Sequence, residues 1–214
     1  MGRGKKVEYR QLRAAVIEVA TEMVKEHGPA SLSIRKIAKN IGCAVGTIYN
    51  VFANLDEIVL TMNGATLGAL KSRLLADTEQ EDDKPAALIG LGQSYVAFCR
   101  ENYNLWSLLL ERKMAPGNTL PEWYQQQVDD LFLLVTQMVA PLVADDNERA
   151  ERAARVLWAG LHGICALAVS GKLDVVHAES AEVLAESLVR NYLQGLRAED
   201  INFHPAPEGR GNKK

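Results

Sequence analysis

The chain has 214 residues, 48% of them apolar and 24% charged, and a formal net charge of −3, which are typical of a soluble globular protein large enough to bury a core. Its three cysteines lie far apart in the sequence, which excludes a disulfide framework and a cysteine metal cluster. The cysteines are therefore expected to be small core residues in a reducing cytoplasm. No apolar run approaches the length of a membrane span, so we expect no membrane partner.

Apolar residues recur at intervals of three and four, and no stretch alternates cleanly between apolar and polar residues. This periodicity predicts an all-α fold. The charges are uneven: nine Lys and Arg stand against four Glu through Phe52, a net charge of +5, whereas the remainder carries −8. Because a charge acts mainly within a Debye length, this asymmetry favours a basic DNA-facing head on an acidic body, although acidic helix surfaces are also ordinary solvated faces.

The first elements are an arm and two helices. Residues 1–8 are predicted to form a flexible basic arm, and apolar spacing predicts a helix over residues 9–27. Gly28 suits the position after the last helical residue, and Pro29 prevents continuation. Ser33 can cap the following helix, because its hydroxyl can accept a hydrogen bond from an otherwise unpaired backbone N–H.

Residues 34–53 have the spacing of a helix-turn-helix. Two helices that cross steeply need a small residue where their backbones approach, here Ala38, and a glycine at the turn, here Gly42. The second helix would then present its outer face to the major groove of DNA, although a helical hairpin packed into a core is the alternative. Apolar residues at the fourth, eighth, tenth, fifteenth and eighteenth positions complete the pattern: Ile37, Ile41, Cys43, Ile48 and Val51.

A long fourth helix is predicted over residues 55–76, with Asn54 as its N-cap. Glycines inside a helix destabilise it, so Gly64 and Gly68 indicate a neighbouring helix that approaches closely. Further helices are predicted over residues 86–100, 104–112, 122–143, 147–170 and 179–197.

The organisation that follows has three parts. Residues 1–53 would form the helix-turn-helix domain with its arm, and residues 54–204 a helical ligand-binding and dimerisation domain. Residues 205–214, rich in Pro, Gly and charge, are expected to be disordered.

The chain resembles the TetR family of bacterial transcription regulators in about residues 10–60. The resemblance rests on residues 33–38, Gly42, residues 46–49, Phe52 and residues 56–58. Residues 157–163 are also similar to a Trp-His-Gly motif in one subgroup of the family's C-terminal domains. The resemblance implies a three-helix DNA-binding domain, followed by a larger helical regulatory and dimerisation domain.

The resemblance also implies a homodimer on a palindromic, double-stranded operator. By position, the residues that would contact phosphates are Ser33, Arg35, Thr47 and Tyr49, and those closest to bases are Val45, Gly46 and Asn50. Hydroxyl and guanidinium groups bind phosphate without reading sequence, whereas an asparagine can pair with an adenine edge and a valine can pack on a thymine methyl. Tyr49 could instead be partly core, and Ser33 only a cap.

Three departures from the family pattern remove phosphate contacts: Ala44 where Ser or Thr is common, Val51 where His is common, and Leu55 where Lys is common. Binding could therefore depend more on the basic N-terminal residues, of which Lys5 and Lys6 are the candidates, although such arms often serve only solubility.

Aromatic residues gather in the middle of the chain, as expected either for an apolar effector cavity or for ordinary core packing. The candidate ligand-binding residues are Trp106, Trp123, Trp158 and His162, for a small apolar or amphipathic effector. His162 could instead be a buried, hydrogen-bonded structural histidine. We expect no metal site and no cofactor, because the histidines are scattered and no carboxylate or thiol cluster accompanies them.

The last two long helices carry apolar stripes that could form a homodimer interface, although burial within one subunit is the alternative. The stripes consist of Ala153, Val156, Leu157, Gly160, Ile164 and Leu167, and of Leu184, Leu188, Tyr192, Leu193 and Leu196. The sequence therefore predicts a ligand-responsive dimeric repressor. The alternative is a DNA-binding architectural or partner-recruiting factor without an effector. We do not expect enzymatic activity, because no phosphate loop, acid/base pair or activated nucleophile is evident in the sequence.

Overall fold

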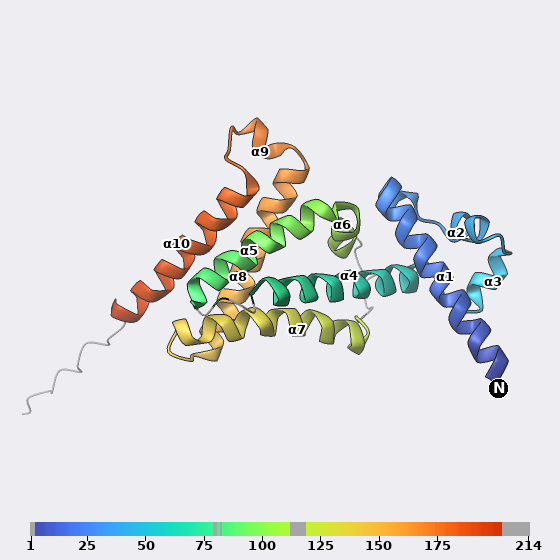
Figure 1. Ribbon diagram of the computed structural model, residues 1–214, viewed down its shortest axis with the longest axis horizontal. Helices are drawn as coiled ribbons and strands as arrows, with labels where there is room; N and C mark the ends of the chain where they lie inside the picture. The colour runs from blue at the N-terminus through green and yellow to red at the C-terminus, as the bar shows by residue number, and fades with distance from the viewer. Residues whose placement is uncertain (1–2, 79–80, 82, 112–118, 203–214) are drawn as a thin grey trace, which may run out of the picture.

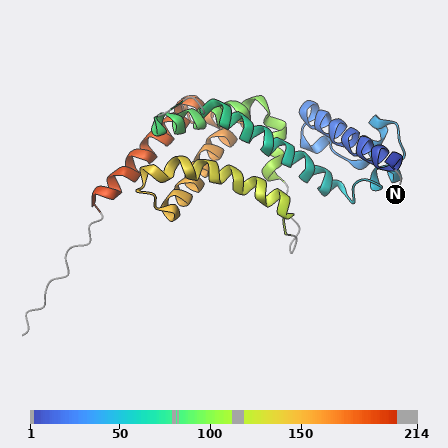
Figure 2. The same ribbon diagram turned by 60° about the horizontal axis from the view of Figure 1, so that its bottom comes forward.

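The computed structural model describes residues 3–78, 81, 83–111 and 119–202, and every regular element in these ranges is helical. Figures 1 and 2 show an elongated molecule in which α1, α2 and α3 form a small head at one end, the later helices form a body, and α4 runs from one to the other. The all-α prediction is therefore confirmed. The predicted disorder of residues 205–214 lies outside the described residues.

The long helices fall close to their predicted positions. Their bounds are α1 (Arg3–His27), η1 (Pro29–Ser31), α2 (Ile34–Ile41), α3 (Val45–Tyr49), α4 (Leu55–Thr78), α5 (Lys84–Glu101), α6 (Tyr103–Glu111), α7 (Glu122–Val139), η2 (Ala140–Leu142), α8 (Asn147–Val169), α9 (Lys172–Val175) and α10 (Ala181–Asn202). The prediction of a flexible arm over residues 1–8 is wrong from Arg3 onward, because Lys, Arg and Glu are good helix formers that extend α1. The short α9 was not predicted.

Local capping rules hold at the ends of the head's helices. Gly28 has φ of +75° and donates its N–H to the Val24 carbonyl. The Ser33 hydroxyl accepts a hydrogen bond from the Lys36 N–H at the start of α2. These caps fix the chain direction between α1 and α2, and therefore the orientation of the helix-turn-helix.

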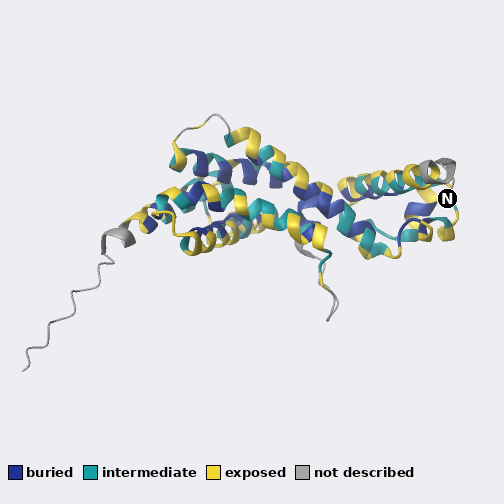
Figure 3. Cartoon of the chain, turned by 90° about the horizontal axis from the view of Figure 1, so that it is seen from below, coloured by how far each residue is buried: buried dark blue, intermediate teal, exposed yellow. Residues whose placement is uncertain are grey.

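The described residues form two apolar cores, one in the head and one in the body. The head core includes side chains from outside residues 1–53, namely Ile58, Val59 and Met62 of α4 and Leu105 and Leu108 of α6. Figure 3 shows buried residues continuing from the head along α4 into the body. The head is therefore completed by two helices that also belong to the body.

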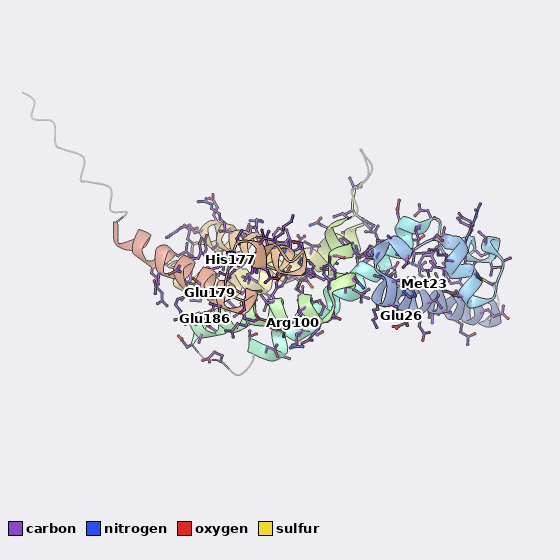
Figure 4. All side chains as sticks on the ribbon, turned by 90° about the horizontal axis from the view of Figure 1, so that it is seen from above. Met23, Glu26, Arg100, His177, Glu179 and Glu186 are labelled. Atoms are coloured by element: carbon purple, nitrogen blue, oxygen red, sulfur yellow. The ribbon has the colours of Figure 1, made fainter. Side chains whose placement is uncertain are left out.

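The body packs α5 against α4, α8 and α10, and α7 against α4 and α8. Cys99 and Cys165 are buried in its core, as expected for small apolar residues, and Cys43 is half-buried against the head core. On the outer edge, Arg100 Nη1 of α5 lies 2.6 Å from Glu182 Oε1 of α10. Figure 4 shows Arg100 and Glu186 on these two neighbouring helices.

The two glycines of α4 differ from each other. A Cβ built on Gly64 would lie 2.7 Å from Cζ3 of Trp123, so α7 does approach closely there, as predicted. A Cβ on Gly68 would meet nothing within 4 Å, so the same prediction is wrong for Gly68. Gly68 lies on an exposed face of α4, where no neighbour requires a small residue.

The structure of α8 bears on two expectations: that no segment could span a membrane, and that α8 carries a dimer stripe, for which burial within one subunit was the alternative. It contains an 18-residue window of mean hydropathy 1.2, so one described helix does reach the length and composition of a membrane span. Part of this apolar surface faces the core of the body, because Ala153 and Leu157 are buried there, as are Leu193 and Leu196 of α10. These four residues of the predicted dimer stripes are therefore inside the subunit. Gly160 also serves internal packing, since a Cβ there would lie 2.5 Å from Cδ2 of Leu188.

Candidate DNA-binding helix and effector cavity

The turn between α2 and α3 depends on Gly42. Its φ is +79°, and its N–H donates to the carbonyls of Ala38 and Lys39, while the Cys43 N–H donates to Ala38. Ala38 is buried, which confirms the small residue at the approach of the two helices. The turn geometry predicted from the sequence is present.

We expect Gly42→Ala to destabilise the protein by about 1–2 kcal/mol, because an L side chain is strained at this left-handed backbone conformation. Gly68→Ala is the matched control: it lies inside α4 with open space around its Cβ, so the same exchange should stabilise by up to about 1 kcal/mol. Urea unfolding of both variants measures the two effects. An unchanged free energy of unfolding in Gly42→Ala would contradict the proposed backbone strain.

α3 has one buried and one exposed face. Ile48 and the following Val51 point into the head core, whereas Val45 is 37% and Tyr49 53% exposed. Gly46 and Asn50 are also exposed, and Thr47 is half-buried. All five candidates on and directly after α3 are therefore accessible, with Asn50 at the helix C-cap rather than inside the helix.

The remaining DNA candidates are placed differently. Arg35 is exposed on α2, while the Ser33 hydroxyl already accepts the capping bond. Lys5 and Lys6 lie in the first turns of α1, and their side chains are outside the described residues. The basic residues nearest the chain start are thus carried on a helix.

Arg13 connects α1 to the end of α3 and the start of α4. Its Nη1 donates to the Val51 carbonyl at 2.6 Å and lies 2.9 Å from Glu57 Oε1, and its guanidinium carbon is 4.0 Å from the centroid of the Phe52 ring. Glu57 Oε2 also accepts the Ala53 N–H at 2.8 Å. Arg13 was not among the site residues predicted from the sequence; its position three residues before buried Val16, on the apolar face of α1, could have indicated it.

Glu57 makes the stability of this connection depend on pH. Burial acts to raise the pKa of Glu57, but the hydrogen bonds from Ala53 and Arg13 and the charge of Arg13 outweigh it and lower the pKa from 4.5. A lowered folded pKa contributes stability above the unfolded pKa, and this stability is lost as pH falls through the folded value.

We therefore expect Glu57→Gln to destabilise the protein at pH 7, and the deficit relative to the wild type to shrink as pH falls below 4.5. Urea unfolding at pH 7 and pH 4 measures this stability deficit. Glu18→Gln, the same exchange at an exposed position of α1, is the control. A deficit that is the same at both pH values would contradict the role of the Glu57 charge.

The body encloses a cavity of about 250 Å³ between α4, α5, α7 and α8. No Lys, Arg, Asp or Glu is among its described lining residues, and the polar groups present are those of Tyr95, Tyr124 and His162 and the indole N–H of Trp158. Leucine and valine side chains supply most of the wall: Leu67, Leu70, Leu74, Leu88, Leu91, Leu109, Val128, Leu131, Val135, Leu157, Leu161 and Val189. An apolar wall with a few polar groups is typical of a small-molecule site.

A hydrogen-bonded network of aromatic side chains lies along one side of the cavity. The Tyr95 hydroxyl is 2.9 Å from His162 Nδ1 and accepts the Trp106 Nε1–H at 3.1 Å. The Trp106 ring stacks on His162 with centroids 4.3 Å apart. Burial lowers the pKa of His162, so the imidazole is neutral at pH 7, and burial raises the pKa of Tyr95.

The four candidate ligand-binding residues divide into two pairs. Trp158 and His162 line the cavity, and Trp158 packs edge-on against Phe132, another lining residue. Trp106 is not a lining residue; it is buried behind His162. Trp123 is 47% exposed, lies outside the cavity wall, and packs against Tyr124 with ring centroids 5.6 Å apart.

Two family models match the two halves of this architecture. The model of bacterial regulatory proteins of the tetR family matches residues 16–62, which include the helix-turn-helix, and the model of a tetracyclin repressor-like C-terminal domain matches residues 88–192. The chain belongs to the TetR family. It is accordingly a DNA-binding transcriptional regulator, with the head as its DNA-binding domain and the body as its regulatory domain.

Other proteins are similar to this chain over most of its length. The HTH-type transcriptional regulator UidR of Escherichia coli strain K12 is 23% identical over 193 residues, which cover 89% of this chain and 92% of UidR. A protein with unknown function from Rhodococcus sp. RHA1 has the same fold, with a TM-score of 0.72, 23% identity, and coverage of 87% of this chain and 95% of that chain. The regulator FadR from Bacillus subtilis, in complex with stearoyl-CoA, has a TM-score of 0.63 at 17% identity, over 85% of this chain and 98% of FadR.

Proposed function

We propose that this TetR-family regulator is a ligand-responsive repressor that acts in the cytoplasm as a homodimer on a palindromic operator. A small apolar or amphipathic effector would bind in the body cavity and change the separation of the two heads. Such a ligand weakens operator binding in proportion to its preference for the misaligned shape.

On the DNA side, the support is the exposed outer face of α3 on a head of net positive charge. Val45, Gly46 and Asn50 would approach base edges, and Arg35, Thr47 and Tyr49 would bind phosphates. Ser33 would contribute mainly by holding the first turn of α2, since its hydroxyl accepts the Lys36 N–H. Lys5 and Lys6 would add phosphate contacts from the start of α1.

On the dimer side, the support is the apolar surface that remains exposed on α8 and α10. Val156 and Leu167 of α8 and Val183 of α10 are exposed, although the same helices bury their other faces in the body. Two copies that meet on these faces around a two-fold axis would form a four-helix bundle and present both α3 helices to the same side of a duplex.

The observation that best supports a ligand response is that α6 packs into both the head core and the body core. Leu105 and Leu108 belong to the head core, whereas Trp106 on the same helix belongs to the body core and to the network beside the cavity. Asn104 also donates to the carbonyl of Lys25 at the end of α1, at 2.8 Å. A ligand that displaces the network would therefore move the packing of the head.

An apolar effector agrees with the cavity wall and with the FadR structure, whose bound stearoyl-CoA carries an acyl chain in a protein of similar fold. Trp158, His162 and Gly163, which resemble the Trp-His-Gly motif of one TetR subgroup, would form part of the site. A body packed solid would have favoured an architectural factor without an effector; the cavity favours the ligand-responsive alternative.

Selection of bound duplexes from a random DNA pool tests the proposal. We expect an inverted repeat whose half-sites are about one helical turn, or a multiple of it, apart, bound by one dimer. A screen for compounds that release this DNA then tests the ligand response. Recovery of no common sequence at low ionic strength would contradict specific DNA binding.

A further inference from the structure

The hydrogen bonds around Tyr95 bear on which nitrogen of His162 carries a proton. The Tyr95 hydroxyl has one hydrogen to donate, and it already accepts the Trp106 Nε1–H at 3.1 Å. An indole N–H can only donate, so this bond has a single possible direction. The other contact of the hydroxyl is His162 Nδ1, 2.9 Å away.

A neutral His162 has two tautomers, and only one of them pairs every group of this network. If Nδ1 carried the proton, it would donate to Tyr95, whose own hydrogen would then have no acceptor among the described residues. Tyr95 is buried, and a buried donor without a partner destabilises a folded protein by about 1–3 kcal/mol. If Nδ1 is unprotonated, the hydroxyl donates to it. His162 is therefore expected to carry its proton on Nε2.

The protonation states of the two side chains agree with this arrangement. Burial raises the pKa of Tyr95, and the side-chain hydrogen bonds from Trp106 and Trp158 offset only part of the rise, so the hydroxyl keeps its hydrogen at pH 7. Burial lowers the pKa of His162, so the ring stays neutral. A charged imidazolium would also place a hydrogen on Nδ1 and leave the Tyr95 hydrogen without an acceptor.

His162 Nε2 is the unpaired end of the network. It has no hydrogen-bond partner among the described residues, yet it is not one of the side-chain atoms that are both sealed and unpaired. His162 lines the cavity, and the buried Trp106 ring covers one face of the imidazole. Trp158 lines the cavity beside it, with ring centroids 5.5 Å apart, and its indole can also only donate. This end of the cavity therefore offers N–H donors.

The rest of the cavity limits the chemistry of an occupant. Its described lining carries no Lys, Arg, Asp or Glu, so an ionised ligand would lose its hydration without gaining a counter-charge. The volume of about 250 Å³ lies just below the usual range for ligand sites, about 300–1,000 Å³. Both features favour a small, uncharged molecule.

We propose that the Nε2–H of His162 donates a hydrogen bond to an acceptor oxygen, of a carbonyl or a hydroxyl group, on a small uncharged effector whose apolar part fills the cavity. This inference rests on the proposed effector site and specifies the polar group of its ligand. Because His162 contacts Tyr95 and Trp106, a ligand held there acts on the network that includes α6.

Three uncharged probes of the same chain length test this contact by calorimetric titration of the full-length protein. 2-Octanone and 1-octanol carry an acceptor oxygen, whereas 1-octyne has no strong acceptor. His162→Phe keeps an aromatic ring in the cavity wall but removes both nitrogens. We expect it to lower the affinity for 2-octanone and for 1-octanol about fivefold or more, and to leave the affinity for 1-octyne within about twofold.

The outcomes of this titration separate the inference from the proposed function. If His162→Phe changed the affinities for all three probes equally, or changed none of them, the inference would be overturned while the cavity remained an effector site. Failure of all three probes to bind the wild type would contradict the proposed ligand response as well.

NMR of the full-length protein labelled with ¹⁵N-histidine reports the tautomer directly, with His162→Phe identifying the His162 signals. We expect a protonated Nε2 whose resonance moves when 2-octanone is added. Tyr95→Phe removes the hydroxyl that fixes the tautomer, so Nδ1–H should become populated. Tyr103→Phe, the same exchange at an exposed residue of α6, should leave the tautomer unchanged. A wild-type His162 protonated on Nδ1 would overturn the inference.

Discussion

Alanine at both Tyr49 and Asn50 is expected to lower affinity for the selected operator by about 30-fold or more, while the protein stays folded. Each good base or phosphate contact contributes about 1–3 kcal/mol, and two such losses at the low end of that range amount to about 30-fold. Both side chains are exposed and lie outside the head core, so their removal leaves Ile48 and Phe52 packed as before.

Gel-shift titration against the operator and against scrambled DNA measures this loss. Tyr103→Ala is the matched control, because Tyr103 is 41% exposed on α6 and belongs to no part of the helix-turn-helix. Circular dichroism and urea unfolding should be unchanged in all variants. Retention of wild-type operator affinity by the double variant would show that another face of the head reads the DNA.

The features predicted correctly from the sequence are those that depend on neighbouring residues. Gly42 and Ser33 act through turns and caps that span three or four residues, so their chemistry is visible in the sequence. The long helices are visible for the same reason, because an apolar stripe repeats along each of them. The apolar spacing also identified Ile48 and Val51 as the residues at and after α3 that are buried.

Features that depend on distant residues were not predictable. Arg13 meets Val51 and Glu57 across 38 and 44 positions, and no periodicity relates them. Gly64 and Gly68 look alike in the sequence, yet only Gly64 faces another helix, because Gly68 lies on the exposed face of α4.

The same limit applies to apolar stripes and aromatic residues. Ala153 and Leu157 lie on an apolar stripe of α8, and periodicity identifies such a stripe without telling whether it faces its own body or a second subunit. Likewise, Trp123 and Trp158 are both aromatic residues of the body, and only the tertiary packing places Trp158 on the cavity and Trp123 outside it.

Trp158→Ala is expected to weaken 1-octanol binding about tenfold with little effect on operator affinity in the absence of ligand. If the ligand covers about 60 Å² of the indole, the lost apolar contact is about 1.5 kcal/mol at about 25 cal/mol/Å², which is about tenfold. The head core contains no part of Trp158, so the DNA-binding surface is unaffected. Calorimetric titration and gel shifts measure the two affinities on the same preparation.

Trp123→Ala provides the control, because it makes the same exchange at a residue outside the cavity wall and should leave 1-octanol binding within about twofold. The exchange at Trp158 also enlarges the cavity, so a longer alcohol such as 1-dodecanol should recover affinity in Trp158→Ala and gain less in the wild type. Recovery by chain length would separate lost contact area from general unfolding of the body. If Trp123→Ala weakened binding as much as Trp158→Ala, the effector would have to bind at the outer face of α7 rather than in the cavity.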